Sequence, residues 1–104
     1  MNEEADAAKM YLLCGQYAGY LAKLGIQARV PGGEEDGVYT AQPPPNCMAL
    51  PHAAWMACTI PQMEPDSINK AMRWLGFAQG VLWCFGVFSI DDLRRHWTTG
   101  RVDG

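Results

Sequence analysis

The sequence predicts a mainly α-helical fold with a minor β element, and three observations support this class. Residues 4–24 and 66–85 both carry apolar side chains at intervals of three and four, a spacing that places them on one side of a helix. Ser89 begins a third stretch, in which acidic residues precede basic ones as they do along a stable helix. Only residues 26–45 contain the alternation of apolar and polar side chains that is typical of strands.

Length and composition indicate one small soluble domain. A chain of 104 residues has room for a single core, so we expect residues 1–104 to form one domain that frays at 1–3 and 98–104. Charged residues make up 18 % of the chain, below the roughly 25 % of typical soluble domains, and four residues are Trp. We therefore expect a partner to cover part of the apolar surface.

Charge and cysteine usage argue against several classes of function. The net charge is −3 and no cluster of basic side chains is present, so direct binding to nucleic acid is not expected. The four cysteines form no CxxC pair, and the acidic Glu3, Glu4 and Asp6 are unlike the basic start of a signal peptide. We expect free thiols and a cytoplasmic location.

The first helix is expected at residues 4–24. Lys23 in its last turn suits the negative end of the helix dipole, and Gly25 suits the left-handed conformation that ends many helices. The apolar stripe that we expect to face the core consists of Met10, Leu13, Cys14, Tyr17, Leu21 and Leu24.

The segment after the first helix is expected to be less regular. Residues 26–30 and 38–41 alternate around a connector rich in turn-forming residues, which predicts a small β-hairpin or extended segment. Such a hairpin must pack on the helices to persist. Pro43–Pro45 supply no backbone donors and hold an extended path, so they end the segment and act as a spacer.

Residues 46–63 carry a weaker pattern. A short helix can open at Leu50, run through Trp55 and Met56, and close at Pro61. We expect this helix without assigning it a role.

Residues 66–85 are expected to form the central helix, which has almost no polar side. Only Asn69, Lys70, Arg73 and Gln79 interrupt its apolar rows. A helix that is apolar nearly all round lies in a core, in a membrane or between chains. Two other helices can hardly cover every side of it, so we expect another polypeptide to do so. The predicted contact surface consists of Ile68, Met72, Leu75, Phe85 and Phe88.

The central helix is expected to be too short to span a membrane. Gly86 can end it, and Ser89 can cap the next helix with Asp92 completing a capping box. The uncharged part from Trp74 to Phe85 is then 12 residues. That is about 18 Å of helix against a hydrocarbon core of about 30 Å, so no membrane association is expected.

Two pairs of glycines lie inside the expected helices. Gly15 and Gly19 are four residues apart in the first helix, as are Gly76 and Gly80 in the central helix. A glycine costs a helix about 1 kcal/mol relative to alanine, and close packing of another backbone can offset that cost. We hypothesise that these helix-packing glycines face one another, within one chain or across a dimer axis. The alternative is that they accommodate neighbouring bulky aromatic rings.

No residue pattern in the sequence predicts catalysis. Cys47, His52 and Cys58 form the one local cluster of metal-binding residue types, with Cys84 or His96 as a conceivable fourth ligand. Structural zinc sites place two cysteines two to four residues apart, which this spacing does not match, so no metal is expected. The sequence contains no glycine-rich phosphate loop, GxSxG or HExxH motif. We expect no enzyme and no cofactor.

One stretch resembles known proteins. Residues 70–83 read KAMRWLGFAQGVLW, and Gly86 and residues 89–94 (SIDDLR) follow. Together with Trp55–Met56, the stretch 52–97 is similar to a helical segment of small bacterial and prophage-type proteins, and in particular to the QslA-type quorum-sensing antiactivators of pseudomonads. The resemblance implies a regulatory protein that binds the ligand-binding domain of a LuxR-type transcription factor such as LasR and blocks its dimerisation.

The expected function is thus regulatory inhibition through protein–protein contact. We also expect a homodimer, because symmetric pairing is the commonest way to bury an excess apolar face. One alternative is a phage-derived structural or interaction module without a transcriptional role. The other is a small metal-binding or redox domain that uses Cys47, His52 and Cys58.

Overall fold

The computed structural model of the chain describes residues 3–29, 49–64 and 67–102. Within these ranges the chain is helical and contains no strand. The elements in order are α1 (Glu3–Lys23), α2 (Ala49–Thr59), the 3-10 helix η2 (Ile60–Gln62), α3 (Ile68–Cys84) and α4 (Ile90–Thr99).

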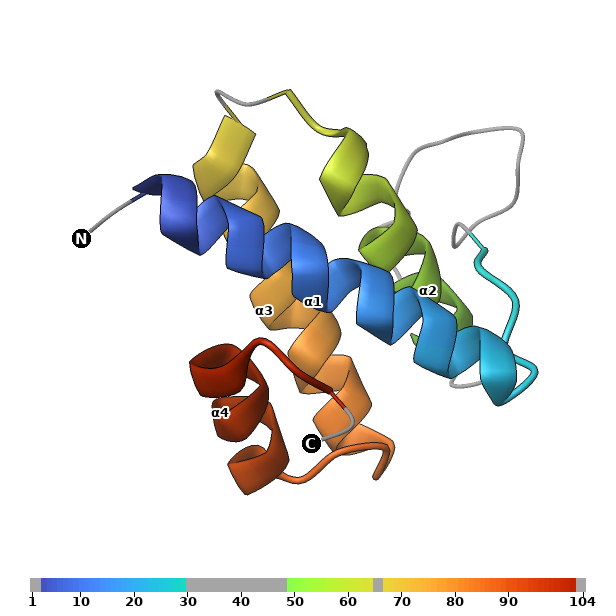
Figure 1. Ribbon diagram of the computed structural model, residues 1–104. Coiled ribbons are helices and arrows are strands. Elements are labelled where there is room, and N and C mark those ends of the chain that lie inside the picture. The colour runs from blue at the N-terminus through green and yellow to red at the C-terminus, as the bar shows by residue number, and fades with distance from the viewer. Residues whose placement is uncertain (1–2, 30–48, 65–66, 103–104) are drawn as a thin grey trace.

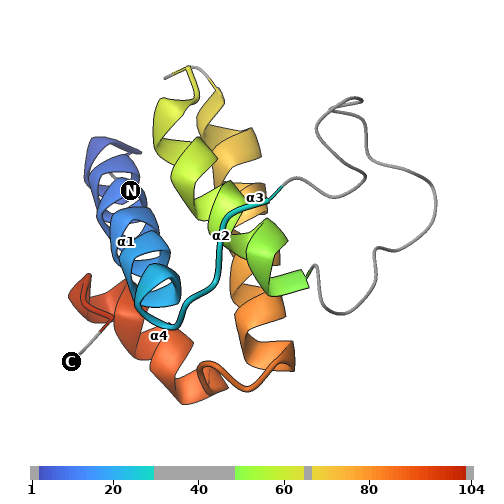
Figure 2. The ribbon, with the colours of Figure 1, turned by 90° about the vertical axis from the view of Figure 1, so that its right-hand side faces the viewer.

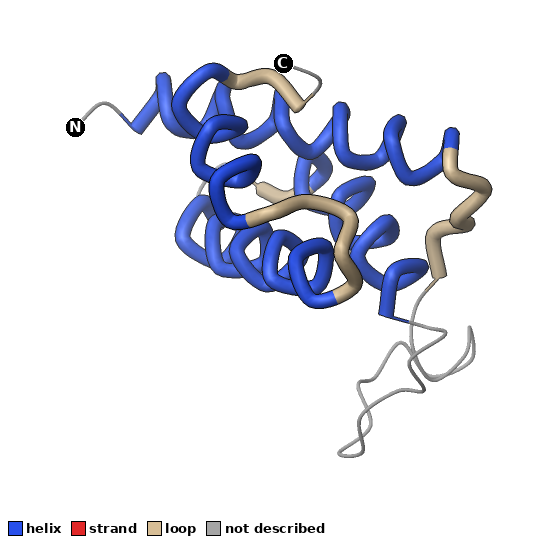
Figure 3. The backbone as a smooth tube through the Cα atoms, turned by 90° about the horizontal axis from the view of Figure 1, so that it is seen from below, coloured by secondary structure: helices blue, strands red, loops and turns tan. Residues whose placement is uncertain are grey.

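The helices form two packed layers. α2 and α3 run antiparallel as a helical hairpin, and α1 crosses one side of this pair (Figures 1 and 2). α4 follows the turn after α3 and packs against α1, and the chain beyond it turns back alongside α1 (Figure 3). The core lies between α1 and the α2–α3 pair.

The apolar stripe predicted for α1 is confirmed except at its last member. Leu24 is exposed because the helix ends just before it. Gly25 takes a φ of +82°, and the N–H of Ile26 donates to the carbonyl of Leu21 at 3.0 Å, which is a Schellman turn. The turn directs Ile26 onto the core in place of Leu24. The buried members of the stripe are Met10, Leu13, Cys14, Tyr17 and Leu21.

The β-hairpin predicted within residues 26–45 is not shown. Residues 26–29 pair with no strand, and the N–H of Arg29 donates to the carbonyl of Pro51 near the start of α2 at 3.0 Å. The rest of that prediction falls on residues 30–45, which lie outside the described residues.

The short helix predicted within residues 46–63 is confirmed as α2. Pro51 fits its first turn, because the N–H groups of a first turn have no partner inside the helix. Pro61 lacks the N–H that would continue the α-helical bonding, and the chain tightens there into η2. The buried side of α2 consists of His52, Ala53, Ala54, Met56 and Ala57.

α3 is buried on one side only, which corrects the prediction of a helix that is apolar nearly all round. Its buried residues recur at intervals of three and four, and two of the four are alanines. Alanine contributes little to a hydrophobic pattern, but it lets neighbouring helices pack closely. The large side chains that dominated the pattern are divided between both sides. The buried residues are Ala71, Leu75, Ala78 and Leu82.

The turn after α3 returns the chain to the core. Gly86 has a φ of +73°, and the N–H of Val87 donates to the carbonyl of Leu82 at 2.9 Å, so α3 also ends in a Schellman turn. The predicted stop at Gly86 is confirmed. Phe88 then packs on Tyr17 of α1 with their ring centroids 5.8 Å apart.

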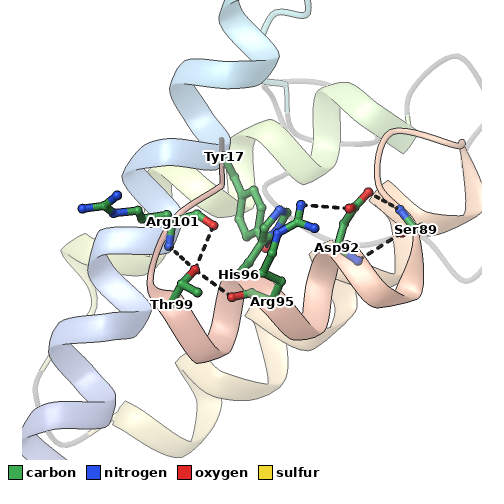
Figure 4. Close-up of polar contacts among 7 residues, drawn as sticks. All are labelled: Tyr17, Ser89, Asp92, Arg95, His96, Thr99 and Arg101. Carbon is green, nitrogen blue, oxygen red and sulfur yellow. Dashed lines mark hydrogen bonds and ion pairs between the residues drawn. The ribbon is translucent and has the colours of Figure 1, made fainter. Parts of the chain in front are cut away.

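The cap predicted for the last helix is confirmed. The Ser89 hydroxyl accepts from the N–H of Asp92, and the Asp92 carboxylate accepts from the N–H of Ser89, both at 3.0 Å (Figure 4). Arg95 pairs with the same carboxylate at 2.9 Å. These hydrogen bonds hold the pKa of Asp92 below its usual value. Gly100 ends the helix with a φ of +73°.

A buried polar cluster joins three helices. The amide nitrogen of Gln79 on α3 donates to the Tyr17 hydroxyl on α1 at 3.1 Å. That hydroxyl lies 2.9 Å from Nδ1 of His96 on α4, and Figure 4 shows the Tyr17 and His96 side chains side by side. Because the oxygen of Tyr17 accepts from Gln79, its hydrogen is free to donate to Nδ1. The ring of His96 also meets Phe88 edge to face at a centroid distance of 4.6 Å.

Burial sets the protonation of this cluster. Burial lowers the pKa of the His96 ring below its usual 6.5, and the nearby Arg95 cation lowers it further, while Asp92 and the Val102 backbone act in the opposite direction. Burial also raises the pKa of Tyr17 to about 12. Both pKa shifts favour the uncharged groups at neutral pH, and in that state the Tyr17 hydroxyl donates to Nδ1 of His96.

The segment after α4 is held to α1 by one side chain. The amide nitrogen of Gln16 donates to the carbonyl of Gly100 at 2.7 Å, and its oxygen accepts from the N–H of Val102 at 2.9 Å. Val102 is buried in the core as a result. α4 is therefore held to α1 by Phe88 before its first turn and by His96 and the Gln16 amide at its last.

We predict that Tyr17→Phe destabilises the fold by about 1–3 kcal/mol, because the Gln79 amide and His96 Nδ1 would both lose a buried partner. Tyr11→Phe is the matched control. Tyr11 is half-buried against the core and makes no hydrogen bond in the described part of the chain, so its loss is expected within about 0.5 kcal/mol. Urea unfolding measures both, and equal losses would contradict a structural role for the cluster.

We predict that acidification destabilises the fold. Burial lowers the pKa of His96 and of His52 in the folded chain below 6.5, the value near which the unfolded chain takes up protons. The free energy of unfolding is therefore at its full value above about pH 6.5 and falls as the pH drops towards the folded pKa values. Urea unfolding at stepped pH measures the slope. His96→Gln should make it shallower, and an unchanged slope would refute the assignment.

Candidate protein-binding face

The exposed side of α3 forms one continuous strip along the helix, opposite its buried alanines and leucines. We call this strip the outer face of α3. At about 100° per residue, Phe77 and Trp83 lie on either side of Gly76 and Gly80 around the helix axis. All members of the face are exposed: Arg73, Gly76, Phe77, Gly80, Trp83 and Cys84.

Large exposed apolar side chains are concentrated in the C-terminal half of α3 and directly after it. Phe77 is 59 % exposed and Trp83 is 51 % exposed, and Phe85, which follows the helix, is 42 % exposed. A single exposed apolar residue is ordinary in a folded protein. Here three large aromatic side chains are exposed within a stretch of nine residues, and such concentrations mark binding surfaces.

Phe77 is held in place by an aromatic cluster between α2 and α3. The ring of His52 stacks on Trp55 with centroids 5.6 Å apart. The rings of His52 and Phe77 meet edge to face with centroids 6.3 Å apart. Trp55 in turn contacts Trp74 at 5.6 Å, and the Lys70 ammonium lies 5.4 Å from the Trp74 ring centroid. A side chain restrained in this way loses less conformational entropy when a partner covers it.

The two pairs of glycines do not face one another within the chain. Gly15, Gly19, Gly76 and Gly80 are all exposed, and a Cβ atom built on any of them meets nothing within 4 Å. The intrachain packing hypothesis is therefore wrong, and so is the alternative that neighbouring rings occupy the space. Both pairs lie on sides of α1 and α3 that the other described residues leave open. Packing across a dimer axis stays a prediction.

The predicted contact residues are divided between core and surface. Leu75 and Phe88 are buried and belong to the core, so assigning them to a contact surface is corrected. Leu75 is on the inner side of α3, and the Gly86 turn carries Phe88 onto Tyr17. Ile68 and Met72 are half-buried against the core. Of the five residues, Phe85 alone is exposed.

Sequence reasoning overlooked Phe77 and Trp83 as contact residues. The signal was present, because both lie on the same side of the helix as Arg73 and the two glycines. A charged residue and residues without side chains mark the side of an amphipathic helix that faces away from the core. The large apolar side chains lie on both sides of α3, so their number alone does not show which side is exposed.

The possible metal ligands are not gathered at one place in the described residues. His52 is buried, Cys58 is exposed, and the two positions lie about 120° apart around α2. Cys47 lies outside the described residues. Of the conceivable fourth ligands, His96 is engaged by Tyr17 and Cys84 lies on the outer face. Within residues 3–29, 49–64 and 67–102, no three His, Cys, Asp or Glu side chains are grouped so as to hold a metal ion.

The buried thiol of Cys14 has low nucleophilic reactivity. Burial raises the pKa of Cys14 to about 12, and the neighbouring Cys58 adds to this. The thiolate, which is the reactive form, is therefore suppressed at Cys14. Cys58 and Cys84 are exposed and accessible to reagents.

No helix in the described part of the chain has both the length and the apolar character needed to cross a membrane. Comparison with protein-family models, with curated proteins and with solved structures finds no match for this chain. Function is therefore argued from the residues of the site.

We predict that Gly80→Ala and Gly76→Ala each raise the free energy of unfolding of the isolated chain by about 0.5–1 kcal/mol. The added methyl group meets open space, and alanine favours the helix. Gly86→Ala is the control with the opposite expectation, because Gly86 has a φ of +73° that alanine adopts with strain. Thermal and urea unfolding measure the change in the free energy of unfolding for each variant. Destabilisation by Gly80→Ala would show that the glycine serves the chain's own packing.

Proposed function

We propose that this protein acts by binding another protein through the outer face of α3. The observation that carries the proposal is the exposure of Phe77 and Trp83 on the side of α3 opposite its buried residues. Residues of this type supply most of the binding energy at protein interfaces, above all Trp. The α2–α3 hairpin presents them on a rigid element, since α1 holds it from the other side (Figure 1).

The two aromatic anchors supply a substantial part of the free energy that such an interface needs. Covering the exposed halves of Phe77 and Trp83 removes on the order of 200 Å² of apolar surface from water. At about 25 cal/mol per Å², this contributes about 5 kcal/mol before the costs of association are subtracted. Micromolar affinity corresponds to about 8 kcal/mol, so contacts around the two anchors must supply the remainder and offset the costs of association.

We further propose that the partner is the ligand-binding domain of a LuxR-type transcription factor similar to LasR. The resemblance of residues 52–97 to the antiactivators of quorum sensing supports this choice, and that stretch includes the whole outer face. Binding would block dimerisation of the transcription factor, because a helix laid against its dimer face competes with the second subunit. In this proposal the protein acts by occupancy and has no catalytic role.

The test is light scattering of the full chain, alone and mixed with a LasR-like ligand-binding domain at micromolar concentration. We expect a complex of one copy of each in place of the receptor dimer. Trp83→Ser and Phe77→Ser should each weaken the complex about tenfold or more. Leu24→Ser is the matched control, because Leu24 is as exposed as these residues but lies at the end of α1.

The same measurement has outcomes that contradict the proposal. Absence of a complex would refute the named partner, and a complex insensitive to both aromatic substitutions would refute the outer face as its contact. The mass of the protein alone tests the expectation of a homodimer. Circular dichroism of each variant shows whether its fold is intact.

A further inference from the structure

The N-terminal half of α3 carries two cations, Arg73 on the outer face and Lys70 beside it, and neither forms an ion pair with another described residue. Between Ser67 and Ile90 the sequence contains Lys70 and Arg73 and no acidic residue. Both ion pairs within the described residues lie in α4, Asp91–Arg94 at 3.9 Å and Asp92–Arg95 at 2.9 Å. α2, which flanks α3, contains no Asp, Glu, Lys or Arg. The outer face and its edge at Lys70 therefore combine apolar anchors with two cations that have no carboxylate partner among residues 3–29, 49–64 and 67–102.

The charges and the anchors are separated along the helix. Arg73 precedes Gly76 by one turn, and Trp83 lies ten residues beyond Arg73. At 1.5 Å per residue these two side chains are about 15 Å apart along the axis. The basic end of the face is thus the N-terminal half of α3, and the aromatic end is the C-terminal half.

We propose that the outer face of α3 binds an α-helix of the partner that carries acidic side chains beside a row of apolar ones. This inference rests on the proposed function and names the chemistry of the partner's contact element. The acidic side chains of that helix lie over Lys70 and Arg73, and its apolar row lies along Phe77 and Trp83.

The shape of the face suits a helix. Helices pack by placing a ridge of side chains into a groove between ridges of the neighbour. On α3, Gly76 and Gly80 carry no side chain and lie between Phe77 and Trp83 around the axis, so a ridge of a neighbouring helix can approach the backbone there. A helix of about three turns covers the whole distance from Arg73 to Trp83. A carboxylate at its basic end can bind the Arg73 guanidinium with two parallel hydrogen bonds.

A second copy of this chain is a poorer occupant of the face. It would present the same two cations and no carboxylate, so a symmetric pair would bring four positive charges to one interface. Charge complementarity across an interface raises association rates and excludes wrong partners. An acidic helix satisfies it, whereas self-association through the outer face does not.

The test uses two fluorescent peptides of about 20 residues with the same leucine and alanine row. One carries Glu beside that row and the other carries Lys. Fluorescence anisotropy with the full chain should show at least tenfold tighter binding of the Glu peptide at low salt, and the difference should shrink in about 0.5 M salt. Arg73→Glu should reverse the preference. Lys23→Glu, an equal charge change on α1, should leave it unchanged.

Alkylation of the cysteines provides an independent readout of position. Cys84 lies on the outer face and Cys58 is exposed on α2. The Glu peptide should slow alkylation of Cys84 and leave that of Cys58 unaffected. Equal protection of the two thiols would place the peptide elsewhere.

Three outcomes would overturn the inference: equal binding of the two peptides, binding of neither, or insensitivity to Arg73→Glu. A dimer of the protein alone that Trp83→Ser dissociates would assign the face to a second copy. The proposed function fails separately. If a receptor domain binds through Trp83 and its affinity is unchanged by Arg73→Glu, the proposed function stands and the acidic helix is refuted. If the Glu peptide binds but the receptor domain does not, the acidic helix stands and the named partner is refuted.

Discussion

The hydrogen bond between Tyr17 and His96 is the interaction on which the arrangement of the helices depends. It connects residues 79 positions apart, and Gln79 extends it to a third helix. α4 presents few apolar side chains of its own, so a neutral histidine takes the place that a leucine or phenylalanine would fill in a purely apolar contact. Its ring packs on Phe88 like an apolar group, while its nitrogen fixes the position of α4 relative to α1.

This arrangement explains why α3 has an uncovered side. α1 crosses the α2–α3 hairpin on one side, and α4 is held beside α1 by His96 and by the Gln16 amide. The described helices thus gather on one side of α3, and the opposite side retains Phe77 and Trp83 at its surface. The position of the candidate binding face follows from where α1 and α2 cover α3. The alanines of α3 contribute as well, since small inner residues let α1 and α2 approach closely.

Features with local causes could be predicted from the sequence. The apolar stripe of α1, the stops at Gly25 and Gly86, and the cap formed by Ser89 and Asp92 depend on residues within one or two turns of each other. The contact between Tyr17 and His96 could not be predicted, because no local pattern pairs residues so distant in sequence. The same limit applies to α3. Periodicity identifies its apolar rows, but the neighbouring helices determine which row faces inward. Leu75, predicted on the contact surface, is therefore found in the core.

The separation of α3 into an inner and an outer side has an evolutionary consequence. Side chains such as Arg73 and Trp83 make few contacts with the rest of their own chain, so natural selection can alter them with little penalty in folding. Lineages that share these four helices could therefore diverge in the targets they recognise through changes along a single strip, while Ala71, Leu75, Ala78 and Leu82 remain constrained by close packing.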